Sequence, residues 1–187
     1  MKSVLLSAGI LLAALFVGLA VATRLLPHQA NFTAVGAVAL VAGAYLGVAW
    51  AAGVTVAAML ASDFVIGFYD LPVMVAVYGS LVLSGVVGRW VGRRVQWGSV
   101  VAGSLSSSAL FFLVTNWAVW QFTQMYPKTW AGLVASYLAA LPFFRNSLLS
   151  DLLYTGVLAL ALQWCLARMR RRQTIVAIPR LHPQLSG

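Results

Sequence analysis

Acidic residues are scarce in this sequence. It has 3 Asp and Glu residues among 187, against 12 Lys and Arg, and 8 % of its residues are charged. A soluble domain carries roughly 25 % charged and about 45–50 % apolar residues, whereas this chain is 62 % hydrophobic, with a mean hydropathy of +0.93. So few polar groups cannot cover a surface in water, and most of the outside must therefore face lipid. The composition predicts a polytopic membrane protein and excludes an ordinary soluble domain.

Cysteine and histidine are also rare. The single Cys165 excludes an intramolecular disulfide and a CxxC metal site, and His28 and His182 lie far apart without ligand spacing. We therefore expect no metal or haem centre and no cofactor.

Catalytic motifs are missing from the sequence as well. There is no GxSxG, Walker A or HExxH motif. The run Ser106–Ser108 is more typical of small-residue packing than of a nucleophile. A membrane enzyme acting on lipid would thus have no recognisable nucleophile or metal site, and we expect no enzymatic activity.

The net charge is strongly positive, at +9. In a soluble protein this would indicate nucleic-acid binding. Membrane proteins collect Lys and Arg in their cytoplasmic loops, however, so the basic balance is expected here without any polyanion partner. We therefore expect no nucleic acid.

Charged and proline-containing breaks divide the apolar runs into six predicted spans, at about residues 3–22, 34–50, 53–68, 72–88, 98–120 and 146–168. The stretch 34–68 must fold back, because as one straight helix it would be about 50 Å long against a hydrocarbon core of about 30 Å. Ala51–Gly53 is the expected reversal. Residues 129–144 are too short before Pro142 to cross the bilayer, and they predict a short capping helix between the fifth and sixth spans.

The expected fold is therefore an all-α membrane helix bundle. It forms a single transmembrane domain over residues 1–172, followed by a short cytoplasmic tail over 173–187.

The distribution of basic residues predicts the orientation of the bundle. With the N-terminus inside, the outer side holds Arg24, Lys128 and Arg145. The inner side holds all the others: Lys2, Arg89, Arg93, Arg94, Arg168, Arg170, Arg171, Arg172 and Arg180. This imbalance predicts that both termini are cytoplasmic, and the Arg-rich tail then needs no partner beyond anionic lipid head groups.

The first span has a second interpretation. Lys2, the apolar stretch after it and Ala20–Ala22 resemble a secretory signal with an A-x-A cleavage site. Because the stretch is longer than a signal core of about 7–15 residues, a retained span is favoured over a cleaved one.

All three acids, Asp63, Asp70 and Asp151, fall on the outer half of this topology. Ionisable groups at membrane depth usually face a cavity or one another. Asp63, Asp151 and Asn116 lie within otherwise apolar helices, and we expect them to line a cavity or a polar network.

A structural role for the same groups is the alternative. Asp151 and Asp63 could pair with Arg145 and Arg24, and Asn116 could bridge two helices. Trp and Tyr residues at this end are also ordinary at a boundary between water and lipid. Small-residue spacings such as Gly43 with Gly47 favour close helix packing, and a docking face for another membrane protein is their alternative use.

Several segments carry a resemblance to known proteins. NFTAVGAVALVAGA, SDFVIGFYD, SSSALFFLVTNWAVW, MYPKTWAGL and LPFFRNSLLSDLLYTGVL, within about residues 24–160, together resemble an uncharacterised family of bacterial proteins described as membrane transport proteins. In architecture the chain also resembles the S components of energy-coupling-factor (ECF) vitamin transporters. Their second and third helices are similar to the segment GAYLGVAWAAGVTVAAMLASDFVIG of this chain. This resemblance implies a small-molecule site on the outer side, a membrane coupling subunit and cytoplasmic ATPases.

We therefore expect a protein of the bacterial inner membrane that binds a vitamin-like small molecule for uptake. Aromatic rings would stack on a planar part of the ligand, and amide and charged groups would satisfy its polar edge. The alternative is a structural membrane protein without a small-molecule ligand, similar in architecture to the cell-shape protein MreD. The candidate substrate-binding residues are Asn31, Asp63, Asp70, Asn116, Trp117, Trp120, Lys128, Arg145, Asn146, Asp151 and Tyr154.

Overall fold

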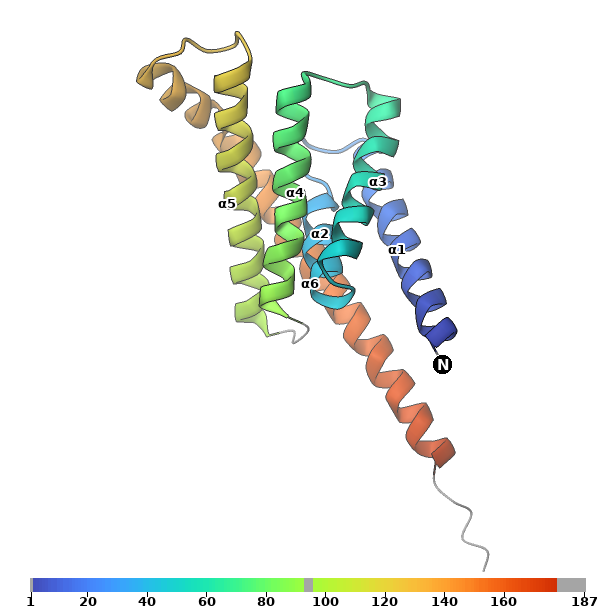
Figure 1. Ribbon diagram of the computed structural model, residues 1–187. Coiled ribbons are helices and arrows are strands. Elements are labelled where there is room, and N and C mark those ends of the chain that lie inside the picture. Colours follow the sequence, from blue (N-terminus) through green and yellow to red (C-terminus); the bar gives the residue numbers. More distant parts are fainter. Residues whose placement is uncertain (1, 93–95, 178–187) are drawn as a thin grey trace, which may run out of the picture.

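The computed structural model describes the backbone of residues 2–92 and 96–177, and the side chains of residues 6–92 and 96–171. The described chain forms six α-helices: α1 (Lys2–Leu25), α2 (Val35–Tyr45), α3 (Val48–Ile66), α4 (Leu71–Val91), α5 (Trp97–Phe122) and α6 (Trp130–Ala177). They pack into one bundle, in which the start of α1 and the end of α6 lie at the same, lower end (Figure 1). The predicted all-α class is confirmed.

Five of these helices, all except α2, are long and apolar enough to cross a membrane. The fold therefore indicates a multi-pass membrane protein. Which end of the bundle faces the cytoplasm stays a prediction. Part of the charge pattern behind it lies outside the described residues, namely Arg93, Arg94, Arg180, the side chains of Lys2 and Arg172, and the tail from 178 onward.

Helix α2 is shorter than predicted and lies at the centre of the bundle. It has 11 residues, which corresponds to about 16 Å, well below a hydrocarbon core of about 30 Å. Val35 and all residues from Ala37 to Ala44 are buried, and the helix contacts each of the other five. A helix that is apolar all round is expected in such a position.

The chain reverses between α2 and α3 at Leu46 and Gly47, and the prediction that it reverses at Ala51–Gly53 is wrong. The backbone N–H groups of Leu46 and Gly47 both donate to the carbonyl oxygen of Ala42. Gly47 has a φ of 101°, which glycine adopts without steric cost. Ala51–Gly53 instead lie inside α3, where Ala51 is fully buried.

Helices α2 and α4 approach each other very closely. A Cβ atom at Gly88 would collide with the backbone carbonyl of Leu40, and one at Gly43 would collide with the carbonyl of Gly85. These glycines therefore serve internal packing. Gly9 of α1, in contrast, has open space where a side chain would lie.

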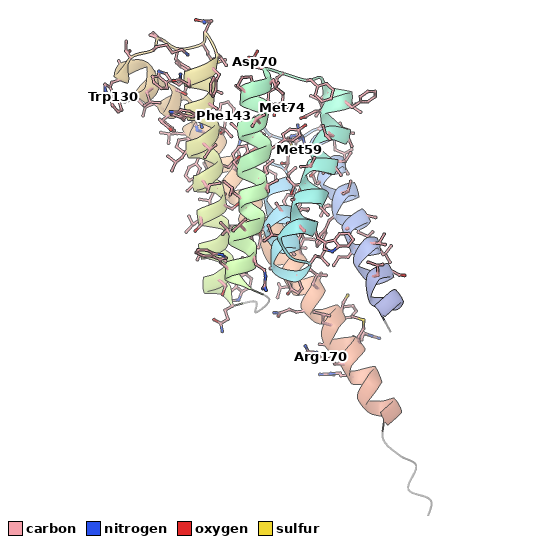
Figure 2. All side chains as sticks on the ribbon, viewed as in Figure 1. Met59, Asp70, Met74, Trp130, Phe143 and Arg170 are labelled. Carbon is pink, nitrogen blue, oxygen red and sulfur yellow. The ribbon has the colours of Figure 1, made fainter. Side chains whose placement is uncertain are left out.

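Helix α6 is one element of 48 residues that contains Pro142. The prediction of a separate capping helix over 129–144 is wrong, because these residues form the first part of α6. Proline removes one backbone hydrogen bond but need not end a helix in a membrane protein. The last part of α6 continues beyond the lower ends of the other helices, and it carries Arg170 (Figures 1 and 2).

Candidate functional site

A cavity of about 470 Å³ lies between the helices, beside the first residues of α2. Small-molecule sites in proteins typically enclose roughly 300–1,000 Å³. The wall combines apolar side chains with hydroxyl, amide, imidazole and charged groups. It is formed by Arg24, His28, Asn31, Thr33, Val35, Gly36, Met59, Ile66, Tyr69, Val77, Leu81, Ser107, Phe111, Ser147, Ser150 and Asp151.

The short α2 explains why a cavity forms here. Its first residues lie lower in the bundle than the upper ends of α3, α4 and α5 (Figure 1). The wall residues Val35 and Gly36 belong to this first turn, whereas Ile66 and Tyr69 come from the end of α3 and the loop after it. The cavity therefore lies between the first turn of α2 and the end of α3.

Asp151 lies on the cavity wall and is 6 % exposed. The hydroxyl of Ser108 donates to its Oδ2 at 2.6 Å, and the backbone N–H of Ala37 donates to the same carboxyl group. A Cβ at Gly36 would collide with Oδ1. Ala34, at the N-cap position of α2, makes no side-chain hydrogen bond that caps the helix. The carboxyl group of Asp151 from α6 caps the N-terminus of α2 instead.

Asp63 forms a buried ion pair with Arg24. The two side chains are 1 % and 16 % exposed, and an Arg24 nitrogen lies 2.5 Å from Oδ1 of Asp63. The hydroxyl of Tyr78 donates to Oδ2 at 2.6 Å, and Arg24 also contacts the sulfur of Met59. The alternative that Asp63 pairs with Arg24 is thus confirmed, and Arg24 rather than Asp63 reaches the cavity wall.

Tyr69 closes part of the wall from the loop between α3 and α4. Partial burial, and then the nearby charge of Asp63, raise the pKa of its hydroxyl to about 12, while Arg24 acts in the opposite direction. The phenol is therefore neutral at physiological pH and can donate a hydrogen bond to a ligand.

His28 also lies on this wall. Its Nδ1 lies 2.6 Å from the carbonyl oxygen of Leu26. Because a carbonyl oxygen can only accept, Nδ1 is the donor, and in the neutral imidazole Nε2 is then an acceptor.

Of the eleven predicted residues, Asn31 and Asp151 lie on the wall of this cavity. Asn31 and Asn116 also line a smaller neighbouring cavity of about 70 Å³. Asn31 has a φ of 61°, a turn conformation that asparagine tolerates. The side chain of Asn116 donates to the carbonyl of Phe112 in its own helix, at 2.8 Å.

Three predicted residues lie around the turn between α5 and α6. Trp120 donates through Nε1 to the carbonyl of Pro127 at 2.9 Å. The ammonium group of Lys128 contacts the carbonyl of Trp120 in α5 and that of Thr123, the residue directly after this helix. Trp117 is 45 % exposed and packs edge-on against Phe122. These three residues therefore make their contacts at the C-terminal end of α5, and none of them lines the cavity.

The remaining predicted residues also lie off the cavity wall. Asp70 is exposed at the start of α4, at the upper end of the bundle (Figure 2). Asn146 holds the loop before α2 by donating to the carbonyl of Ala30, and Tyr154 packs edge-on against Phe32 in that loop. Arg145 is exposed, and among the described residues Asp151 forms no ion pair with it.

Several wall residues were not among the predicted ones. Ser147 and Ser150 precede Asp151 by four and one positions in α6. Residues three or four apart share one helix face, so the spacing of four between Ser147 and Asp151 was the available signal for Ser147. No pattern in the sequence predicted that Gly36 lies against the Asp151 carboxyl group, because this contact depends on the packing of α2 against α6.

The described residues offer no metal site, since no three His, Cys, Asp or Glu side chains come together among them. The chemistry that this wall supports is hydrogen bonding and charge recognition around a partly apolar ligand.

Comparison with known proteins places the chain in a family. No curated protein and no solved structure matches it. The family DUF6580, described as a family of unknown function, matches residues 5–175. This agrees with the predicted resemblance to an uncharacterised family, and it gives no likeness to the S components of ECF transporters. The chain therefore belongs to DUF6580, a family of unknown function.

Proposed function

We propose that this protein binds a small molecule in the cavity beside α2, as the substrate-binding membrane subunit of an uptake system. The observation that supports the proposal is the cavity itself, with a volume of about 470 Å³ and a wall of mixed character. Phe111, Leu81 and Val77 supply apolar surface, whereas Arg24 and Asp151 supply ionisable, hydrogen-bonding groups. A partly apolar wall with a few placed polar groups is the usual composition of a ligand site.

The proposed location is the bacterial inner membrane, with both termini in the cytoplasm. The charge pattern favours this orientation, because Arg170 lies on the part of α6 that extends beyond the bundle (Figure 2), and Arg168 and Arg171 are its neighbours in the sequence. Asp70 lies at the opposite end (Figure 2). Basic residues favour the cytoplasmic side, so the cavity would open towards the outside, where a nutrient arrives.

Uptake against a gradient would need an energy source outside this chain. The sequence contains no Walker A loop that could bind a nucleotide. The proposal therefore includes a membrane coupling subunit with cytoplasmic ATPases and a vitamin-like ligand, as in the S components that the chain resembles in architecture.

Mass spectrometry of small molecules extracted from the purified protein tests this proposal. Ser147→Phe places a ring into the cavity wall, and the control Leu149→Phe places the same ring on an exposed face of the same helix. We expect a compound that is extracted from the wild type and from Leu149→Phe but lost from Ser147→Phe. Equal recovery from all three variants would refute binding in this cavity.

A scaffold without a ligand is the second candidate, and one observation favours it. Both buried acids have internal partners, Asp63 with Arg24 and Tyr78, and Asp151 with Ser108. These contacts hold helices together whether or not a ligand binds. The scaffold predicts that no compound is extracted and that Ser147→Phe is harmless to the cell.

A further inference from the structure

We propose that Asp151 is ionised, and that the cavity therefore selects a neutral or cationic ligand and excludes anions. Among the described residues, no basic side chain pairs with the Asp151 carboxyl group. The inference rests on the proposed function, since it concerns the ligand of the same cavity. It follows from the partners of the two charged side chains on the wall, Arg24 and Asp151.

Arg24 is already neutralised. Its guanidinium lies 2.5 Å from Asp63, whose side chain is 1 % exposed and lies off the cavity wall. An anion that approaches Arg24 therefore meets an ion pair instead of an unpaired cation. The guanidinium can still donate hydrogen bonds into the cavity, but it adds no net positive charge there.

Asp151 has hydrogen-bond donors around it and no basic side chain. Its described partners are the hydroxyl of Ser108 and the backbone N–H of Ala37, and its carboxyl group lies against Gly36 at the N-terminus of α2. The donors and the helix N-terminus favour the ionised carboxylate, whereas burial of the side chain opposes it. The donors and the helix terminus carry only partial charges, so they stabilise an ionised Asp151 without cancelling its charge.

The hydrogen-bonding groups of the wall favour the same kind of ligand. Asp151 accepts hydrogen bonds, and Nε2 of His28 is an acceptor when the imidazole is neutral. A ligand with an ammonium or N–H group would satisfy them, whereas a carboxylate or phosphate would be repelled by Asp151. Because the cavity lies within an apolar bundle, this charge is screened less than it would be in water.

The charge preference can be measured without knowing the ligand. In a Cys165→Ser background, which removes the chain's single cysteine, Ser147→Cys places a thiol on the wall one helical turn from Asp151. The rates of modification are compared for 2-(trimethylammonio)ethyl, 2-sulfonatoethyl and methyl methanethiosulfonate. All three reagents attack the same thiolate, so its pKa cancels from the ratio of rates.

We expect the ratio of cationic to anionic rates to exceed that for 2-mercaptoethanol in the same buffer by about tenfold. Asp151→Asn should return the ratio to the reference value. A ratio no higher than the reference would overturn the charge preference while leaving a cavity that binds ligands intact, and this comparison stands even if Asp151→Asn does not fold. Failure of the neutral methyl reagent to react would show a cavity closed to water and would refute the proposed function as well.

Discussion

Replacing Asp63 with leucine removes one partner of a buried ion pair and leaves Arg24 alone at the cavity wall. The Asp63 side chain is 1 % exposed, accepts from Arg24 at 2.5 Å and accepts from Tyr78 at 2.6 Å. Removing one partner of such a pair typically costs about 3–5 kcal/mol, because an unpaired charge stays buried. Arg24 is 16 % exposed and borders the cavity, so some hydration is available to it, and we expect a loss of about 3 kcal/mol.

The double variant Asp63→Leu with Arg24→Met is the informative comparison. Replacing both members of a buried pair with apolar side chains is often nearly neutral. The hydroxyl of Tyr78 would lose its acceptor, which costs about 1 kcal/mol. We therefore expect the double variant to lie within about 1 kcal/mol of the wild type and to be clearly more stable than Asp63→Leu alone.

Equilibrium unfolding in detergent micelles by added sodium dodecyl sulfate measures these differences, with the 7 tryptophans as the fluorescent reporter. The variants Asp63→Leu, Arg24→Met and the double variant complete a thermodynamic cycle. If the double variant were destabilised by the sum of the single losses, the pair would not be coupled, and the structural role assigned to Asp63 would be refuted.

Two further predictions concern the packing of α4 and the wall residue Tyr69. Gly88→Ala should destabilise the bundle by about 1–3 kcal/mol, because the added methyl group meets the backbone of Leu40. The control Gly79→Ala on the same helix has open space for the methyl group and should be neutral or slightly stabilising. Equal thermal unfolding midpoints for the two variants would contradict the close approach of α2 and α4. The pKa of Tyr69 is raised to about 12 in the folded protein, above the value of about 10 in the unfolded chain. The contribution of the neutral Tyr69 hydroxyl to the free energy of unfolding should therefore be complete below about pH 10 and should be lost as the pH rises through the folded-state pKa. Phenolate absorbance of the wild type minus that of Tyr69→Phe measures this titration, and an ordinary midpoint for Tyr69 would contradict its burial beside Asp63.

The sequence predicted the elements better than the turns between them. The apolar runs were sufficient for the all-α class and for the reversal within residues 34–68. Gly43, Gly47 and Gly53 look alike in that run, however, and the burial of Ala51 and the close approach of Gly43 to α4 are tertiary facts that decide which glycine turns. The same holds for Pro142, which bends or ends a helix depending on its surroundings.

The candidate site was predictable to a similar degree. Asp63 and Asp151 stood out because an acid within an apolar helix needs a partner, and Asp151 indeed borders the cavity. Trp120 and Lys128 lie at the same end of the chain's predicted topology, but their contacts serve the C-terminus of α5. Proximity to one end of a bundle does not reveal which side chains face inward, because the helix rotation is set by packing.

The central claim is that a small molecule occupies the cavity beside α2. Native mass spectrometry of the intact protein released from gentle detergent tests it most directly, because bound compounds appear as a discrete added mass. We predict one such adduct on the wild type and on Leu149→Phe, absent from Ser147→Phe. A wild-type spectrum without any adduct after exposure to a cell extract, or an adduct equally present on Ser147→Phe, would contradict the account.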